Sequence, residues 1–271
     1  MFKINNLTYQ YDKTRKALDN VSMDFNKGDI IGIIGSNGSG KSTLFNNLMG
    51  ILKSTEGEIL YNGEQIKYDK KSLYNLRKEV GIVFQDPEKQ IFYSMVYDDI
   101  AFALRNIGID EKTIKERIHT ALEAVNGLQF IDRPVHNLSF GQKKRVAIAS
   151  VVAMENKLVL LDEPTAGQDF KHYTEIMEFL KELNKKGVTI VMITHDMHLM
   201  LEYTDRSIVL SDGEKIAEDK AFRILTDNEV IERANLKETS LYQLALKANL
   251  ANPREFVNKF IDYDRRTRES E

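Results

Sequence analysis

Apolar and polar positions follow two different patterns along the chain. In about the first sixty residues, short apolar runs alternate with turn residues, as in FKINNLTYQY, ALDNVSMDF and EILYNGEQI, where an Asn-Gly pair is typical of a hairpin. Unbroken apolar runs occupy residues 29–35, 80–84, 158–161, 188–193 and 207–210. Strands buried on both faces give such runs. The pattern therefore predicts an α/β fold, with an N-terminal antiparallel β layer and a central, mainly parallel sheet covered by helices on both faces.

Helical periodicity appears between these runs. One stretch follows Asp110, a suitable N-cap, and repeats apolar residues on one face at Ile114, Ile118, Ala121, Leu122 and Val125. Because it lies between the second and third apolar runs, we expect an inserted α-helical subdomain at about residues 86–155. A second helix carries Ile176, Phe179, Leu180 and Leu183, and Gly187 is placed to end it before the next strand.

The end of the chain has a different character. From about Lys237 the sequence is amphipathic, and it closes with the charged stretch DRRTRESE. This composition predicts a small appendage at residues 236–271 whose tail is frayed.

Composition narrows the class of protein. The chain has 271 residues, 42% hydrophobic and 29% charged, with a net charge of −3, and contains no cysteine. Disulfides and thiolate metal sites are therefore excluded, which suits a reducing compartment. No basic patch marks a nucleic-acid partner, and no apolar run approaches the roughly 20 residues of a membrane-spanning helix. The N-terminus is polar, unlike a signal peptide. A role at a membrane would be that of a peripheral subunit.

The strongest chemical motif is GSNGSGKS, which matches the pattern G-x-x-x-x-G-K-[ST] between an apolar run and a helical one. Glycines let the backbone wrap with its N–H groups pointing inward, and the following helix presents its positive end to phosphates. Lys41 would reach the β and γ phosphates, and the Ser42 hydroxyl suits Mg²⁺. The bland alternative is a glycine-rich turn with a surface lysine. We expect a nucleotide site made by Gly35, Ser36, Asn37, Gly38, Ser39, Gly40, Lys41, Ser42 and Thr43.

Polar residues at the ends of three apolar runs fit such a site. In LVLLDEP, Asp162 would hold Mg²⁺ and Glu163 would polarise the attacking water, although many strands simply end in a polar turn. His195, in VMITHD, would donate to the γ-phosphate or orient water, whereas a structural role or a metal pair with His198 are the alternatives. Gln85 ends another run and is a candidate metal ligand or phosphate sensor.

Tyr11 closes an early strand. It offers a flat face on which a purine can stack, and core packing of the ring is the alternative.

In chain order, Tyr11, GSNGSGKST, Gln85, LSFGQ, LVLLDEP, AGQD and His195 resemble the motifs of the ATP-binding subunits of ABC transporters, over about residues 1–235. The resemblance implies a P-loop ATPase that uses ATP and Mg²⁺, with Glu163, His195 and Gln85 as catalytic residues and with Ser42, Gln85 and Asp162 around the metal.

The loop LSFGQ has two interpretations. Ser139 and Gln142 form an S-x-x-Q capping box for an apolar helix running from about Lys143 to Ala153, which needs no function. The resemblance adds that such a loop closes on the ATP of a partner subunit, so that Ser139, Gly141, Gln142 and Asp169 would complete a head-to-tail dimer with two ATP molecules. Two residues depart from the family pattern.

The first departure is Phe140, which stands where glycine is usual; its backbone must either suit a side chain or be strained at positive φ. The second is Gln168, which replaces the usual leucine, and the sequence offers no physical account of it.

The stretch FQDPEKQIFYSMVYDDIAFALRNIGI is similar to the energy-coupling factor (ECF) importers, especially their cobalt and nickel members. The resemblance implies a transmembrane coupling subunit docked beside residues 86–92, a substrate-binding membrane subunit, a second ATPase chain, identical or paralogous, and a place at the cytoplasmic face of the membrane. It also implies an appendage that keeps the ATPases paired. Vitamin uptake, a non-transport ABC ATPase acting on DNA or ribosomes, and a small-molecule P-loop kinase are the alternatives.

Overall fold

The computed structural model describes residues 1–12, 14–236 and 240–270. Its central sheet has the strand order β10-β9-β3-β8-β7-β6, and neighbouring strands are parallel except for the β9–β10 pair. The strands are β3 (Ile30–Ile34), β6 (Val80–Val83), β7 (Leu158–Asp162), β8 (Thr189–Ile193), β9 (Arg206–Ser211) and β10 (Glu214–Asp219). The predicted mainly parallel sheet is confirmed, and each unbroken apolar run forms one of its strands.

A second sheet is antiparallel, as predicted, with the order β2-β1-β4-β5. It contains β1 (Phe2–Gln10), β2 (Lys16–Phe25), β4 (Glu56–Tyr61) and β5 (Glu64–Gln65). The turn between β4 and β5 is Asn62–Gly63, and both residues have positive φ (51° and 86°), which matches the twist of a tight hairpin. The same chemistry recurs at Asp212–Gly213 (48° and 85°), where it turns β9 into β10, an edge strand that the apolar pattern did not reveal.

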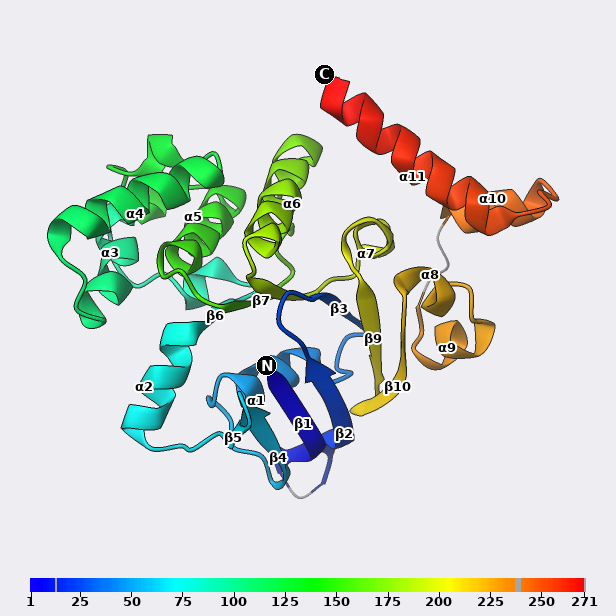
Figure 1. Ribbon diagram of the computed structural model, residues 1–271, viewed down its shortest axis with the longest axis horizontal. Helices are drawn as coiled ribbons and strands as arrows, with labels where there is room; N and C mark the ends of the chain where they lie inside the picture. Colours follow the sequence, from blue (N-terminus) through cyan, green and yellow to red (C-terminus); the bar gives the residue numbers. More distant parts are fainter. Residues whose placement is uncertain (13, 237–239, 271) are drawn as a thin grey trace.

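Helices occupy several of the connections between strands, and further helices follow the last strand, β10 (Figure 1). The α-helices are α1 (Lys41–Leu48), α2 (Lys70–Glu79), α3 (Val96–Asn106), α4 (Glu111–Ala124), α5 (Phe140–Ala153), α6 (Phe170–Lys185), α7 (Met197–Tyr203), α8 (Ala221–Ile224), α9 (Asn228–Arg233), α10 (Ser240–Lys247) and α11 (Pro253–Ser270). Short 3₁₀ turns are η1 (Pro87–Lys89), η2 (Leu128–Phe130) and η3 (Val135–Asn137).

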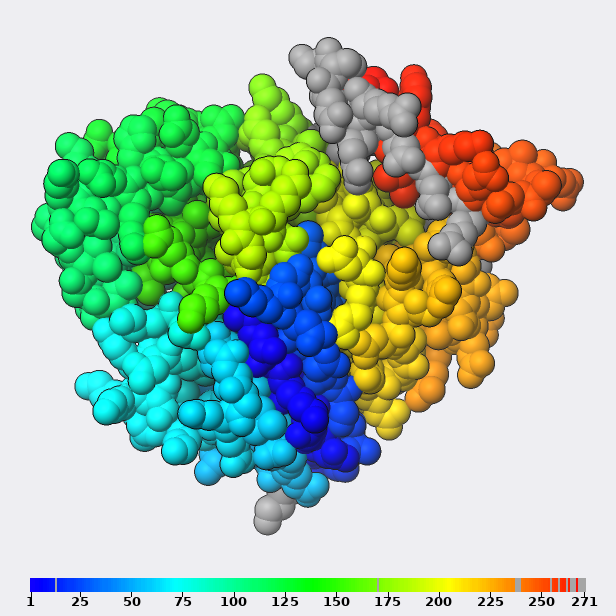
Figure 2. All heavy atoms as spheres, viewed as in Figure 1, coloured from blue at the N-terminus to red at the C-terminus, as the bar shows by residue number. Residues whose placement is uncertain are grey.

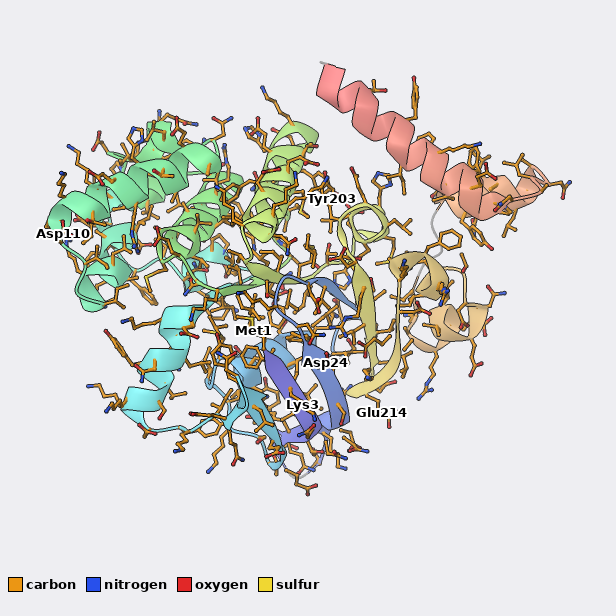
Figure 3. All side chains as sticks on the ribbon, in the orientation of Figure 1. Met1, Lys3, Asp24, Asp110, Tyr203 and Glu214 are labelled. Atoms are coloured by element: carbon orange, nitrogen blue, oxygen red, sulfur yellow. The ribbon has the colours of Figure 1, made fainter. Side chains whose placement is uncertain are left out.

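The predicted helix caps are present. Asp110, labelled in Figure 3, precedes α4, and its carboxylate accepts a hydrogen bond from the Thr113 N–H. Helix α5 begins at Phe140, three residues before the predicted start at Lys143, because the capping residue Ser139 stands directly before the first helical residue.

The central sheet has two apolar faces because its side chains alternate in direction. Ile31, Ile33 and the even-numbered leucines of β7 pack with α1 and the antiparallel sheet, whereas Val159 and Leu161 pack with α3, α4, α5 and α6. Helices α3, α4 and α5 gather on one side of the sheet, and the division of residues 86–155 as a separate subdomain stays a prediction. In the space-filling view these helices (green) continue into the surface of residues 51–90 (cyan), with α11 (red) at the opposite corner (Figure 2).

The C-terminal helices α10 and α11 pack on each other through Ala245, Val257 and Ile261, all buried, and Tyr242 meets Phe222 of α8 edge to face. The prediction of a frayed tail is wrong up to Ser270, because α11 continues through the charged residues. The predicted boundary near Lys237 and the last residue, Glu271, lie outside the described residues. No helix in the described part of the chain has the length and apolarity to span a bilayer.

Candidate active site

The loop between β3 and α1 has the backbone that its glycines predict. Gly35 (φ +151°) and Gly40 (φ +102°) lie in a region that favours glycine, and an added Cβ would stand 2.0 Å from the Leu210 carbonyl oxygen and 2.4 Å from that of Ala17, respectively. Gly40 is the N-cap of α1 and no side chain caps this helix. The positive end of α1 is therefore open to an anion.

Lys41 folds back onto the loop. Its buried ammonium donates to the carbonyl oxygens of Gly35 (2.8 Å) and Ser36 (2.7 Å), and Ser39 Oγ lies 3.3 Å away. Burial lowers the pKa of this lysine, while the carboxylates of Glu163 and Asp162 favour its charged form. The loop thus holds the Lys41 cation on its own carbonyl oxygens, at the wall of the pocket.

Oxygen donors suited to Mg²⁺ meet at the end of β7. Ser42 Oγ donates to Asp162 Oδ2 at 2.9 Å, and Gln85 lines the same pocket. A hydroxyl, a carboxylate and an amide oxygen are the hard ligands that Mg²⁺ takes when it also keeps waters and phosphate oxygens. The donor set fits the ion that the resemblance implies, which Ser42, Asp162 and Gln85 would hold.

Glu163 is held in an unusual conformation. Its φ is +48°, a left-handed value that costs a non-glycine residue roughly 1–2 kcal/mol, and its N–H donates to the Ile193 carbonyl at 2.9 Å. Burial first, and then the neighbouring Asp162 carboxylate, raise the pKa of Glu163 to about 7. Its Oε1 is buried without a hydrogen bond to any described residue. A proton acceptor poised near neutral pH with one unsatisfied oxygen is what activation of a water requires.

His195 lies against this acid. Its Nε2 is 3.4 Å from Glu163 Oε1, in ion-pair range but outside hydrogen-bond geometry. Burial, followed by the charge of Lys41, lowers the pKa of His195, which favours the neutral form of the ring. His198 turns instead toward Glu202 (3.7 Å), and no cluster of three His, Asp or Glu side chains suited to a metal occurs among the described residues.

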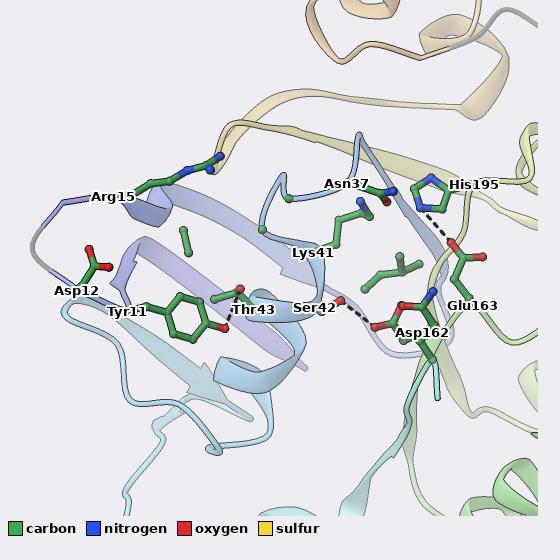
Figure 4. Close-up of a pocket in the computed structure, with 15 residues that line it drawn as sticks. Tyr11, Asp12, Arg15, Asn37, Lys41, Ser42, Thr43, Asp162, Glu163 and His195 are labelled. Carbon is green, nitrogen blue, oxygen red and sulfur yellow. Dashed lines mark hydrogen bonds and ion pairs between the residues drawn. The ribbon is translucent and has the colours of Figure 1, made fainter. Parts of the chain in front are cut away.

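Most of the predicted site residues line one pocket, drawn in Figure 4. Tyr11 stands at its mouth, 64% exposed, with its hydroxyl 3.2 Å from Thr43 Oγ1. The predicted residues on the wall are Tyr11, Asn37, Gly38, Gly40, Lys41, Ser42, Thr43, Gln85, Asp162, Glu163 and His195. Gly35, Ser36 and Ser39 lie behind them, in contact with the Lys41 ammonium.

Sequence reasoning missed Asp12, Arg15 and Ala17, which line the same pocket as Tyr11; Asp12 and Arg15 are labelled in Figure 4. They lie at and after the turn between β1 and β2, where no motif singled them out.

The LSFGQ loop lies outside this pocket. Ser139 Oγ accepts from the Gln142 N–H (3.3 Å) and Gln142 Oε1 accepts from the Ser139 N–H (3.0 Å), so the predicted capping box is confirmed. Gly141 and Asp169 likewise line no part of the pocket, and Asp169 caps α6 by accepting from the His172 N–H (3.0 Å).

The two departures from the family pattern meet each other. Phe140 is the first residue of α5 and has no positive φ, so its side chain costs no backbone strain. Its ring covers Gly167, where an added Cβ would stand 2.6 Å from Phe140 Cδ1. Gln168 Nε2 donates to the Gly141 carbonyl at 2.9 Å. The unexplained glutamine is thus half of a contact that joins residues 140–141 to residues 167–168 within one chain.

Comparisons with known proteins agree with this geometry. The ABC transporter family matches residues 18–166. A Clostridium perfringens protein, provisionally named as an ABC transporter ATP-binding protein, is 51% identical over 99% of this chain and 47% of its own length, and an Enterococcus faecalis protein with a similar name is 44% identical over 99% and 47%. The chain spans about half the length of the curated relatives it matches.

Matches to solved structures cover most of both chains. The structure of cbiO1 from Clostridium perfringens, described as part of the ABC transporter complex cbiONQ, is 40% identical with a TM-score of 0.77, over 92% of this chain and 98% of that one. The dimeric bacterial ABC transporter cassette MJ0796 is 30% identical with a TM-score of 0.76, over 82% and 99%. With this fold, this match and this site, the chain belongs to the ABC transporter family.

Proposed function

We propose that this chain is the energy-coupling ATPase of an ECF-type importer for cobalt or nickel ions, working at the cytoplasmic face of the membrane. The observation that carries the proposal is an exposed aromatic surface that follows the pocket residue Gln85 in the chain. Phe92 (79% exposed), Tyr93 (44%) and Phe102 (41%) stand on and before α3, shortly after Gln85 of the pocket wall. An exposed aromatic cluster of this kind marks a protein contact.

Contacts within the chain hold the aromatic surface in place. Tyr93 and Phe102 pack with ring centroids 5.2 Å apart. The buried Asp99 carboxylate accepts hydrogen bonds from the N–H groups of Phe92 (2.8 Å) and Tyr93 (3.0 Å), which fixes the backbone of the surface. A transmembrane coupling subunit seated here would bear directly on the segment that leads to Gln85. The similarity to cbiO1 supports an importer of this branch.

The pocket residues have separate tasks in the proposed reaction. The phosphate loop and the open end of α1 bind the phosphates, Tyr11 stacks on the base, and Lys41 exchanges its two carbonyl partners for phosphate oxygens. Mg²⁺ held near Ser42, Asp162 and Gln85 would neutralise charge on the phosphates. Glu163 takes a proton from the attacking water, and neutral His195 orients that water or donates to the γ-phosphate.

Four of the predicted nucleotide-binding residues lie outside the pocket of their own chain. Because Ser139, Gly141, Gln142 and Asp169 line no part of the pocket, we propose that they complete the pocket of a second cassette, identical or paralogous, in a head-to-tail dimer. MJ0796 is described as dimeric, also in a post-hydrolysis state with ADP and Pi, which supports this arrangement.

The test is reconstitution with membrane subunits. The chain should co-purify with a membrane protein complex, and the complex in vesicles should take up labelled Co²⁺ or Ni²⁺ in step with Mg²⁺-dependent ATP hydrolysis. Changing the aromatic surface with Phe92→Ser should abolish co-purification, while Ile51→Ser, at an exposed apolar position outside the aromatic surface and outside the C-terminal appendage, serves as the matched control. Uptake of a vitamin instead of the metals would keep the importer and reject the cargo. Binding to DNA or ribosomes with no membrane partner would reject the importer.

A further inference from the structure

A lysine outside the described pocket is completely buried. Lys144 stands on the second turn of α5, has 0% exposure, and directs its ammonium at the ends of two strands. The ammonium donates to the carbonyl oxygens of Phe84 (2.8 Å), Gln85 (3.0 Å) and Asp162 (2.9 Å). An ammonium has three protons, and each has an acceptor here.

The burial of this lysine requires compensating interactions. A cation removed from water is costly unless its hydrogen bonds are complete and opposite charges are near. Here Asp162, Glu163 and Asp86 favour the charged form, although burial lowers the pKa of Lys144 to about 8. The cation also counters the effect of burial on Glu163, whose ionised form it favours together with Lys41. Lys157, at the other end of β7, shows the ordinary alternative: it is 64% exposed and pairs with Glu79 (2.7 Å).

The Asp162 carbonyl matters because it belongs to the peptide that joins Asp162 to Glu163. That peptide is held on both sides, its oxygen by Lys144 and its N–H by the Ile193 carbonyl. It directly precedes the left-handed φ of Glu163. A strained conformation persists only where its surroundings over-determine it, and these two bonds do so.

The start of the Gln85 segment is held from the same helix. The Phe84 and Gln85 carbonyls bind Lys144, and the Phe84 N–H donates to Gln90 Oε1 (3.2 Å). Gln90 in turn donates to the Ala147 carbonyl of α5 (2.9 Å). Helix α5 therefore makes hydrogen bonds both to the end of strand β7, at Asp162, and to the segment that leads from Gln85 to the aromatic surface.

We propose that Lys144 is a positioning residue for ATP hydrolysis, which fixes the backbone of Gln85 and Asp162 and so aims Glu163 at the attacking water. This inference rests on the proposed ATPase function. It also ties the helix that carries Ser139, directed at the partner, to the chain's own nucleotide pocket.

The experiment compares two variants and a control. Lys144→Met removes charge and donors with a similar length, Lys144→Gln keeps an amide with two donors, and Lys157→Met is the matched control next to the same strand. For each we measure thermal stability, ATP affinity by calorimetry, and kcat and KM for Mg²⁺-ATP in the assembled complex. We expect Lys144→Met to lose at least tenfold in kcat with ATP affinity within about threefold, Lys144→Gln to fall between it and the wild type, and Lys157→Met to match the wild type.

A double variant separates positioning from mere stability. If Lys144 acts through Glu163, adding Lys144→Met to Glu163→Gln should lower single-turnover hydrolysis by less than threefold more. Full additivity, an unchanged kcat in folded Lys144→Met, or unfolding of both Lys144 variants would each overturn the inference. A wild-type complex without Mg²⁺-dependent hydrolysis would instead overturn the proposed function.

Discussion

The chain contains two glycine-bearing loops that lead into helices, and the two helix ends are finished in different ways. Helix α1 begins at Lys41, its N-cap residue Gly40 provides no side-chain cap, and both residues line the pocket. Helix α5 starts after Ser139, which forms a complete capping box with Gln142 at an exposed surface. The free N–H groups at an uncapped helix N-terminus can bind an anion, whereas in a capped helix a side chain already accepts one of these hydrogen bonds. The difference supports the proposal that the first loop binds phosphate within its own chain and that the second contributes to the pocket of a partner.

The largest expected effect tests whether ATP hydrolysis depends on Glu163, in the pocket beside the loop that precedes α1. Glu163→Gln keeps the size and the backbone of the side chain but removes the proton acceptor. We expect ATP binding to persist and turnover to fall at least about a hundredfold, the usual scale for a general base. The measurement is ATP hydrolysis in the assembled complex beside calorimetric binding. Near-normal turnover would show that another group activates the water.

A smaller effect is expected when the two loops are compared by the ATP affinity of one variant in each. Lys41→Ala removes a charge-assisted contact to phosphate, which is worth about 1.5–3 kcal/mol, so affinity should fall at least about tenfold. Ser139→Ala in the same isolated chain should leave affinity within about twofold, because Ser139 lies outside the pocket. Calorimetry of the two variants decides between them. Equal losses would mean that both loops serve one nucleotide in one chain.

Sequence pattern predicted the central sheet well because short unbroken apolar runs bounded by turn residues arise mainly in strands that are buried on both faces. It also predicted which residues of one chain share a pocket, since carboxyl ends of parallel strands meet at one edge of a sheet. Asp162, Glu163, His195 and Gln85 all lie at or just after the ends of such strands, and all line the pocket. Their chemical roles stay predictions that the experiments above test.

Contacts between distant segments escaped the sequence for a physical reason. In KKR, the first lysine pairs with Glu88 at the surface, while the second, Lys144, is buried under two strand ends, and nothing in the three letters separates them. The helical period can tell which of the two lysines is buried only when the start of α5 is known to within one residue. The sequence pattern placed that start three residues late. Gln168 was unexplained because its acceptor, the Gly141 carbonyl, is a backbone atom 27 residues away.

The smallest expected effect concerns this last contact, which joins the region directed at the partner to the segment that follows Glu163. Gln168→Leu, the residue usual in the family pattern, removes one hydrogen bond to the Gly141 carbonyl and leaves the ring of Phe140 over Gly167. We expect the free energy of unfolding to fall by about 1 kcal/mol, measured by urea denaturation, with ATP affinity unchanged. Gln65→Leu, at an exposed position of β5, should change stability by less than about 0.5 kcal/mol. If the two variants are equally stable, the bond adds nothing to the folded chain. The capped loop would then be held by α5 alone, free to move toward a partner independently of Glu163.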